Sequence, residues 1–107
     1  MIYELRVYRV VQGRMADLLA RFEHQTLRIM VRRGFLQAAF WTTIVGRSEQ
    51  LTYLLAWQSL AQRQEQRAAF ESDAEWLAIR KSTEEDDTLI FDIESPLLRS
   101  TNFSAAK

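Results

Sequence analysis

The chain has 107 residues, a length suited to one domain. It balances 14 lysines and arginines against 14 aspartates and glutamates, so no net charge would draw it to nucleic acid or to an anionic membrane. The sequence contains no cysteine, which excludes thiolate catalysis, disulfides and cysteine-bound metals, and its single histidine, His24, argues against a histidine-rich metal site. We therefore expect no nucleic-acid partner, no metal and no cofactor.

The N-terminal segment Ile2–Val10 predicts a β-strand, because side chains of different polarity alternate along it with a period of two. This strand begins directly at the N-terminus, so we expect no signal or transit peptide before it. No apolar run reaches the roughly 20 residues that a transmembrane helix needs. Together these features favour a cytoplasmic protein without a membrane span.

Gln12 and Gly13 predict a turn into a long helix over Arg14–Arg33. One mostly apolar stripe recurs along this segment at helical spacing, formed by Met15, Leu18, Leu19, Phe22, Thr26, Ile29 and Met30. Gly34 is the residue type that ends such a helix, since glycine readily adopts the left-handed backbone conformation.

A β-hairpin is predicted next. Its first strand is Phe35–Val45, which is rich in aromatic and β-branched residues, and its second strand is Leu51–Trp57. The segment Gly46–Glu49 would form the tight connection between them.

Two helix starts follow the hairpin. Ser59, with Gln62 three residues later, has the spacing of a capping box and predicts a short helix that ends at about Phe70. Asp73 can cap a further helix that extends to about Thr83.

The acidic run Glu84–Asp87 predicts a loop, and Leu89–Glu94 predicts the last strand. Pro96 would confine the end of that strand to a sheet edge or a bulge. Residues 1–99 are therefore expected to form one domain, with residues 100–107 as a polar C-terminal tail. The element order β-α-β-β-α-β is that of an α+β, ferredoxin-like fold, in which four strands form an antiparallel sheet and both helices cover one face.

The alternation within the strands divides the sheet into two faces. One face is almost purely apolar and is expected to pack under the helices: Tyr3, Leu5, Val7, Leu36, Ala38, Phe40, Leu54, Ala56, Leu89, Phe91 and Ile93. The other face mixes aromatic, ionisable and aliphatic side chains: Glu4, Arg6, Tyr8, Gln37, Ala39, Trp41, Thr43, Leu51, Tyr53, Leu55, Trp57, Asp92 and Glu94. A soluble monomer rarely exposes an apolar patch on the order of several hundred Å². We therefore predict that a homodimer buries this second face.

Three segments of the sequence resemble the NIPSNAP family: MIYELRVYRVVQGRM, GFLQAAFWTTIVGRSEQLTYLLAWQSL and RAAFESDAEW. The family belongs to the dimeric α/β-barrel superfamily, so the resemblance implies a ferredoxin-like protomer that dimerises, sheet against sheet, into an α/β barrel. Gln12 stands where the family often has proline. Most members have no assigned reaction, while other members of the superfamily are cofactor-independent monooxygenases, lactone isomerases and haem-degrading enzymes. No catalytic motif of those enzymes is present, so the resemblance transfers no catalytic residue.

The candidate ligand-binding residues lie on the mixed face: Glu4, Arg6, Tyr8, Trp41, Tyr53, Trp57, Asp92 and Glu94. If the first and last strands are neighbours, Glu4 or Arg6 approaches the acids of the last strand. A carboxylate in a dry site would have a raised pKa and could act as a general base, while Arg6 could hold an enolate or carboxylate oxygen. Aromatic walls would suit a flat organic ligand. The alternative is that Arg6 and the acids pair only to satisfy a dimer interface.

The sequence leaves three functions open. The leading hypothesis is a NIPSNAP-like dimer of unassigned molecular activity that binds a small molecule or a protein. The second is a cofactor-independent monooxygenase or isomerase that acts on a small organic substrate, and the third is a structural or scaffold dimer. Whether the protein is an enzyme is not decided by the sequence.

Overall fold

Five strands form one antiparallel sheet in the computed structural model, which describes residues 1–47, 49–84 and 88–106. Strand β1 (Ile2–Val10) lies between β3 (Gln50–Trp57) and β4 (Ile90–Glu94), and β2 (Leu36–Thr42) pairs with the far side of β3. The short β5 (Leu97–Arg99) pairs with the beginning of β1. The order β2-β3-β1-β4 confirms the predicted α+β, ferredoxin-like fold, and β5 is an addition that the sequence pattern did not indicate.

One long helical segment follows β1. It consists of α1 (Met15–Arg21), a π-helical turn η1 (Phe22–Thr26) and α2 (Leu27–Arg32), with helical backbone angles across both junctions. The predicted helix over Arg14–Arg33 is therefore confirmed, and the π-helical turn within it was not predicted. The second helical region consists of α3 (Leu60–Glu71) and α4 (Ala74–Thr83), which are also separate in the prediction.

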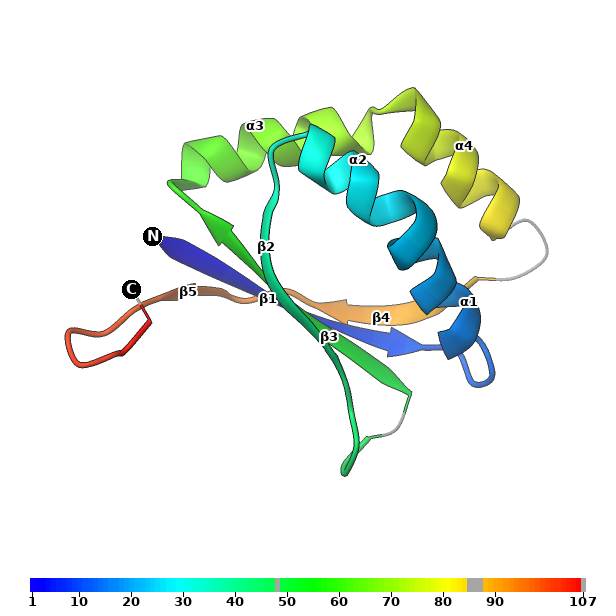
Figure 1. Cartoon of the computed structure of the whole chain (residues 1–107), viewed down its shortest axis with the longest axis horizontal. Helices are drawn as coiled ribbons and strands as arrows, with labels where there is room; N and C mark the ends of the chain where they lie inside the picture. The colour runs from blue at the N-terminus through cyan, green and yellow to red at the C-terminus, as the bar shows by residue number, and fades with distance from the viewer. Residues whose placement is uncertain (48, 85–87, 107) are drawn as a thin grey trace.

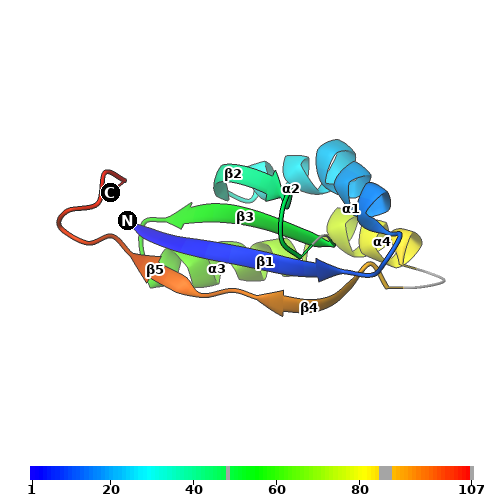
Figure 2. The ribbon, with the colours of Figure 1, turned by 90° about the horizontal axis from the view of Figure 1, so that it is seen from below.

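All helices lie on the same side of the sheet (Figure 1). Viewed from below, the opposite sheet face is not covered by any helix of the described residues (Figure 2). No helix among the described residues is long and apolar enough to cross a membrane.

Both helices of the second region begin at the capping residues that the sequence predicted. At the start of α3 (Leu60–Glu71), Ser59 Oγ accepts a hydrogen bond from the Gln62 backbone N–H at 3.1 Å. At the start of α4 (Ala74–Thr83), a carboxylate oxygen of Asp73 accepts from the Trp76 backbone N–H at 3.0 Å. Each cap satisfies a backbone donor that the first helical turn leaves free.

Asp73 also joins the two helical regions. Its second oxygen accepts hydrogen bonds from Arg32 Nη2 at 2.7 Å and from Arg33 Nε at 2.9 Å, at the end of α2. Only 2% of the Asp73 surface is exposed, whereas the side chains of Arg32 and Arg33 are 47% and 39% exposed, so water reaches the arginine side of this junction. It holds α2 and α4 side by side above the sheet.

The prediction of which sheet face packs under the helices was wrong. On β1 the buried residues are Glu4, Arg6, Tyr8 and Val10, and on β3 the same alternation buries Leu51, Tyr53, Leu55 and Trp57. Tyr3, Leu5 and Val7, expected in the core, are only half-buried on the uncovered face. On β1 and β3 the mixed face is the covered one, and its charged groups Glu4 and Arg6 pair with each other there.

The last part of the chain departs from the prediction in detail. The final long strand begins at Ile90 rather than at Leu89, and Leu89 itself is fully buried. Of the predicted acidic loop, residues 85–87 lie outside the described residues. After β5 the chain continues without further strands or helices as far as residue 106, and the ring of Phe103 is 90% exposed.

The two serines that flank α3 provide a test of this fold. We expect Ser59→Ala to lower the free energy of unfolding by about 1 kcal/mol, because the first turn of α3 loses its side-chain cap. Ser72, at the other end, donates to the Ala68 carbonyl at 2.9 Å and accepts no helix N–H, so Ser72→Ala is the matched control and should cost under about 0.5 kcal/mol. Urea unfolding measures both. Equal losses would contradict the assigned cap.

Candidate functional site

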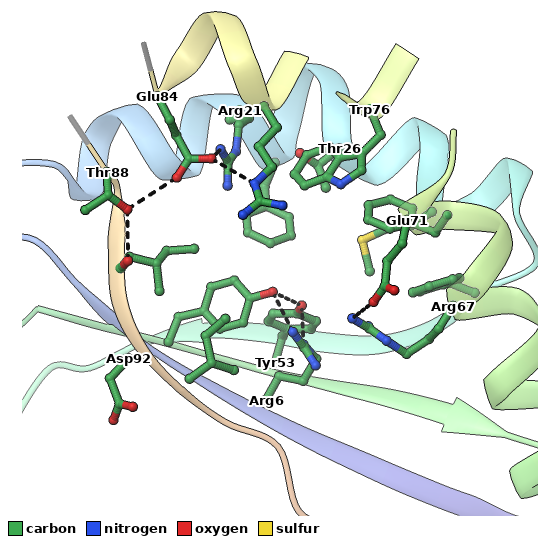
Figure 3. Close-up of a pocket in the computed structure, with 18 of the residues that line it drawn as sticks. Arg6, Arg21, Thr26, Tyr53, Arg67, Glu71, Trp76, Glu84, Thr88 and Asp92 are labelled. Atoms are coloured by element: carbon green, nitrogen blue, oxygen red, sulfur yellow. Dashed lines mark hydrogen bonds and ion pairs between the residues drawn. The ribbon is translucent and has the colours of Figure 1, made fainter. Parts of the chain in front are cut away.

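A cavity of about 600 Å³ lies between the sheet and the helices. Arg6, Tyr8 and Tyr53 lie on its sheet side, and Figure 3 shows Arg6 and Tyr53 there, facing the helices. The helical side is contributed by η1, α2, α3 and α4, with Phe22, Thr26, Met30, Phe70 and Trp76 among the lining residues. The cavity thus lies within a single chain, beneath the helices.

Strand register explains why the three polar residues meet. Arg6 and Tyr53 are direct cross-strand partners in the β1–β3 ladder. Tyr8 follows Arg6 by two residues and therefore points to the same face. Alternation along two neighbouring strands is enough to place one guanidinium and two phenols together.

These three side chains form a closed set of hydrogen bonds, which we call the tyrosine–arginine cluster. Arg6 Nε donates to Tyr53 Oη at 2.8 Å, and Arg6 Nη2 donates to Tyr8 Oη at 3.0 Å. The two phenol oxygens are themselves 2.7 Å apart. The guanidinium carbon also lies 5.2 Å from the centre of the Tyr8 ring, within the range of a cation–π contact.

Glu4 fixes the cluster from behind. Its carboxylate is completely buried and receives Arg6 Nη1 at 2.9 Å, Arg63 Nε at 2.8 Å and Trp57 Nε1 at 3.0 Å. Ser95 Oγ also donates to it. With this many donors, the buried charge is compensated on both oxygens.

The pKa of Glu4 is low, which corrects the expectation of a buried carboxylate with a raised pKa. Burial alone would raise it, but the hydrogen bonds from Arg63, Ser95 and Arg6 outweigh burial and lower the pKa from 4.5 to about 2. Glu4 therefore remains ionised at neutral pH and is a poor general base. Its role is to hold Arg6.

The pKa shifts of Arg6 and Tyr53 keep the cluster in a defined protonation state. Burial lowers the pKa of Arg6, but the oxygens of Tyr53, Tyr8 and Glu4 more than offset burial and raise it above its ordinary value. Burial raises the pKa of Tyr53 well above 10, and Tyr8 adds to this while Arg6 opposes it. At neutral pH, Arg6 is a cation and Tyr53 is a neutral phenol.

The cluster has more donors than acceptors. Each phenol oxygen accepts one bond from Arg6, and one phenol donates to the other, so the second phenolic proton remains available. Arg6 has five N–H groups, of which four are used by Tyr53, Tyr8, Glu4 and Ser95 within the described part of the chain. The sheet side of the cavity can therefore donate to an added oxygen atom.

Aromatic rings form much of the remaining wall. Phe22 packs edge-on against Tyr53 with ring centres 5.5 Å apart. Phe40, which is outside the lining, stacks on Tyr53 at 4.6 Å. Further along the helices, Phe70 contacts Trp76 with ring centres 4.9 Å apart. Such walls suit a flat, largely apolar molecule.

Charged pairs surround the aromatic part of the cavity. Arg67 Nη2 lies 3.1 Å from Glu71 Oε1, while Glu84 receives Arg21 Nη1 at 3.1 Å and lies 3.4 Å from Arg80 Nε. The lining thus contains the arginines Arg6, Arg21, Arg67 and Arg80 and the acids Glu71, Glu84 and Asp92. Arginines are in excess among the described lining residues, which favours an anionic or electron-rich ligand.

The structure brings together only some of the residues that the sequence indicated. Arg6, Tyr8, Tyr53 and Asp92 line the cavity, and Glu4 and Trp57 lie directly behind it. Trp41 is on the uncovered face and is 51% exposed, and Glu94 is also on that face, opposite Val7 in the strand ladder.

The expected approach of Glu4 or Arg6 to the acids of the last strand was wrong. The neighbour of these acids is Arg9, whose Nη1 lies 2.6 Å from Asp92 and whose Nη2 lies 2.8 Å from Glu94. Arg9 pairs directly with Asp92 in the β1–β4 register, so it points to the face opposite Arg6. Accordingly, the Asp92 carboxylate in Figure 3 points away from the tyrosine–arginine cluster.

The lining residues from the helices were not identified as site residues. Phe22, Thr26 and Met30 do belong to the predicted helical stripe, but a stripe of this kind is usually packed core. No pattern in the sequence marked Arg21 or Trp76 as a site residue. Their contact, with the Arg21 guanidinium carbon 5.1 Å from the centre of the Trp76 ring, joins segments far apart in the sequence. No group of three or more metal-ligating side chains occurs in residues 1–47, 49–84 and 88–106.

Comparison with known proteins decides the family. The family model for NIPSNAP matches residues 3–105. The chain belongs to the NIPSNAP family. No curated protein sequence matches it.

Solved NIPSNAP structures are similar to this one over almost their entire length. A NIPSNAP family protein from Agrobacterium tumefaciens is 25% identical with a TM-score of 0.89, and the match covers 99% of this chain and 98% of that one. A second NIPSNAP family protein from the same organism, named as one with unknown function, is 26% identical with a TM-score of 0.87, covering 98% and 92%. These NIPSNAP relatives agree with the expectation of an unassigned molecular activity.

The fold extends beyond the family. A proposed antibiotic biosynthesis monooxygenase from Nitrosomonas europaea has a TM-score of 0.64 at 10% identity, over 94% of this chain and 98% of that one. At this identity the similarity concerns the fold alone.

The pKa of Glu4 gives a pH prediction for stability. A carboxylate with a lowered pKa contributes stability above its unfolded pKa of 4.5, and that contribution is lost as the pH falls toward 2. We expect Glu4→Gln to be less stable than wild type by about 3 kcal/mol at pH 7, with the difference shrinking between pH 4.5 and 2.

Urea unfolding at several pH values measures this difference. Glu23→Gln, at an exposed position of η1, is the matched control and should follow the wild-type pH profile. A Glu4→Gln difference that stays constant from pH 7 to pH 2 would refute the assigned ionised, multiply bonded carboxylate.

Proposed function

We propose that this protein binds a small, flat organic acid or carbonyl compound in the cavity between its sheet and its helices. The observation that carries the proposal is the tyrosine–arginine cluster: a cation and two phenols with unused N–H and O–H donors at one side of an aromatic-walled cavity. A carboxylate, enolate or carbonyl oxygen is the partner that such donors require.

The size and charge of the cavity favour ligand binding over a purely structural role. A scaffold would be expected to fill its interior, since protein cores are close-packed. A volume of about 600 Å³ is within the usual range for small-molecule sites. The excess of arginines among the described lining residues also supports an anionic ligand over a cationic one.

Binding has more support than catalysis. A cofactor-independent monooxygenase or isomerase needs a base near the reacting atom. Each acidic residue of the described lining is paired with arginine: Glu71 with Arg67, Glu84 with Arg21 and Asp92 with Arg9. The enzymatic alternative rests on fold similarity alone, so the proposal remains one of binding.

We also propose that the uncovered sheet face forms a homodimer. This face carries Tyr3, Leu5, Val7 and Leu54 at intermediate burial, with Leu36 and Trp41 more than half exposed. A second copy of the same surface would remove these side chains from water through a self-complementary contact. The face differs from the one assigned to the interface from the sequence, and it is the more apolar of the two.

Matched aromatic probes test the binding proposal. We expect 2-naphthoate to bind in isothermal titration calorimetry and to raise the melting temperature, while naphthalen-2-ylmethylammonium, its cationic counterpart, does neither. Tyr53→Phe and Tyr8→Phe should each weaken 2-naphthoate binding roughly tenfold, because each removes one hydrogen bond near a charged ligand. Arg6→Met should abolish binding.

Arg9→Met is the matched control, since Arg9 lies on the same strand and faces the opposite side. It should leave the affinity for 2-naphthoate unchanged. The proposal fails if the two probes bind equally well, if neither benzoate, 2-naphthoate nor biphenyl-4-carboxylate binds at millimolar concentration, or if Arg9→Met and Arg6→Met have the same effect.

Light scattering coupled to size exclusion tests the dimer. At micromolar concentration the wild type should elute with the mass of two chains, and Leu54→Glu, at the centre of the uncovered face, should elute as one chain because it places charge in the interface. Leu77→Glu, on the exposed surface of α4, is the control and should remain a dimer. A wild-type protein with the mass of a single chain would rule out this interface.

A further inference from the structure

Arg67 reaches the cavity from α3. Arg63, one turn earlier on the same helix, donates from Nε to the Glu4 carboxylate at 2.8 Å, so this face of α3 is turned toward the sheet. Residues four apart lie on the same face of a helix. Arg67 therefore leaves α3 on the sheet side and lines the cavity, and Figure 3 shows its guanidinium extending toward the part of the cavity where Arg6 and Tyr53 lie.

The Arg67 guanidinium is accessible and only partly used. Its side chain is 19% exposed, and its Nη2 donates to Glu71 Oε1 at 3.1 Å. Its Nε and Nη1 have no hydrogen-bond partner among the described residues and, unlike the Nε of Arg21, they are not buried. The guanidinium carbon lies 5.9 Å from the centre of the Phe35 ring, which also lines the cavity. Arg67 therefore holds donors that a molecule in the cavity can reach.

The Glu71 carboxylate occupies Arg67 in the structure. Glu71 also lines the cavity, its side chain is 62% exposed, and Arg67 is its one hydrogen-bonding partner in the described part of the chain. An exposed ion pair four residues apart on a helix contributes little to stability, so Glu71 can release Arg67 at a small cost. The contact also shows that a carboxylate fits against Arg67 at the cavity wall.

The charges at this end of the cavity are unbalanced. Arg6 and Arg63 share the Glu4 carboxylate, and Arg67 pairs with Glu71. Three guanidinium groups thus face two carboxylates among the residues that the structure describes. Glu4 is completely buried and held by several donors, whereas Glu71 is exposed and held by one. An incoming acid can therefore displace Glu71 but not Glu4.

We infer that Arg67 is a second arginine that binds the acid group of the ligand, and that Glu71 competes with the ligand for it. When the acid enters, one of its oxygens takes the place of the Glu71 carboxylate, which turns to solvent. This inference rests on the proposed binding function and narrows the ligand class to acids. A neutral carbonyl oxygen forms a weaker bond to a guanidinium than a carboxylate does, so it does not displace Glu71.

Exchange of the Glu71 carboxylate for an amide tests the competition. We expect Glu71→Gln to bind 2-naphthoate about two- to fivefold more tightly than wild type in isothermal titration calorimetry, because no ion pair has to be broken first. Arg67→Met should bind it roughly tenfold more weakly, since a charged hydrogen bond is lost. 2-Naphthamide, a neutral probe of the same shape, should bind wild type at least about tenfold more weakly than 2-naphthoate.

A charge control and a double variant separate competition from simple repulsion. Glu65→Gln removes the same charge from another exposed position of α3 and should leave the affinity for 2-naphthoate unchanged. In the Arg67→Met background, Glu71→Gln should bring no gain, because no guanidinium remains to compete for. Repulsion between Glu71 and the ligand would instead persist in that background.

The outcomes distinguish this inference from the proposed function. Suppose that 2-naphthoate binds and that Arg6→Met abolishes its binding. If Glu71→Gln then behaves like Glu65→Gln, if its gain persists without Arg67, or if 2-naphthamide binds as tightly as 2-naphthoate, the inference is overturned and the proposed function stands. If none of the carboxylate probes binds, both are overturned.

Discussion

The structure depends on one buried anion, the Glu4 carboxylate. It is completely shielded from water and lies between the guanidinium groups of Arg6 and Arg63. An unpaired charge at this position would be too costly to bury, so the surrounding donors are a condition of the fold. Because Arg63 belongs to α3 and Arg6 to β1, the same carboxylate fixes the helix above the sheet and the cation inside the cavity.

The two faces of the sheet differ in composition. The helix-covered face holds the polar cluster and a cavity, and its charges are compensated internally or directed at the space between sheet and helices. The uncovered face is largely apolar, with Arg9 and its two acidic partners toward the β4 edge. We therefore propose ligand binding in the interior of the chain and association through the opposite surface, so that the two functions use different residues.

Much of the fold could be predicted from local patterns. The caps at Ser59 and Asp73 and the strand alternation follow from interactions within a few residues, and the structure has all of them. Alternation also grouped Arg6, Tyr8 and Tyr53 correctly on one face. It could not say which face the helices cover, because that depends on how Glu4 is neutralised by distant partners. The helical wall of the site was missed for the same reason, since its polar groups matter only through tertiary placement.

Glu4 and Arg6 act as a coupled pair, and a double-mutant cycle on stability tests this coupling. The free energy of unfolding is measured in urea for wild type, Glu4→Gln, Arg6→Met and the double variant. We expect the double variant to lose less than the sum of the single losses, by about 2 kcal/mol or more, because each single change leaves the other group buried with an incomplete set of partners. Losses that add to within about 0.5 kcal/mol would contradict it.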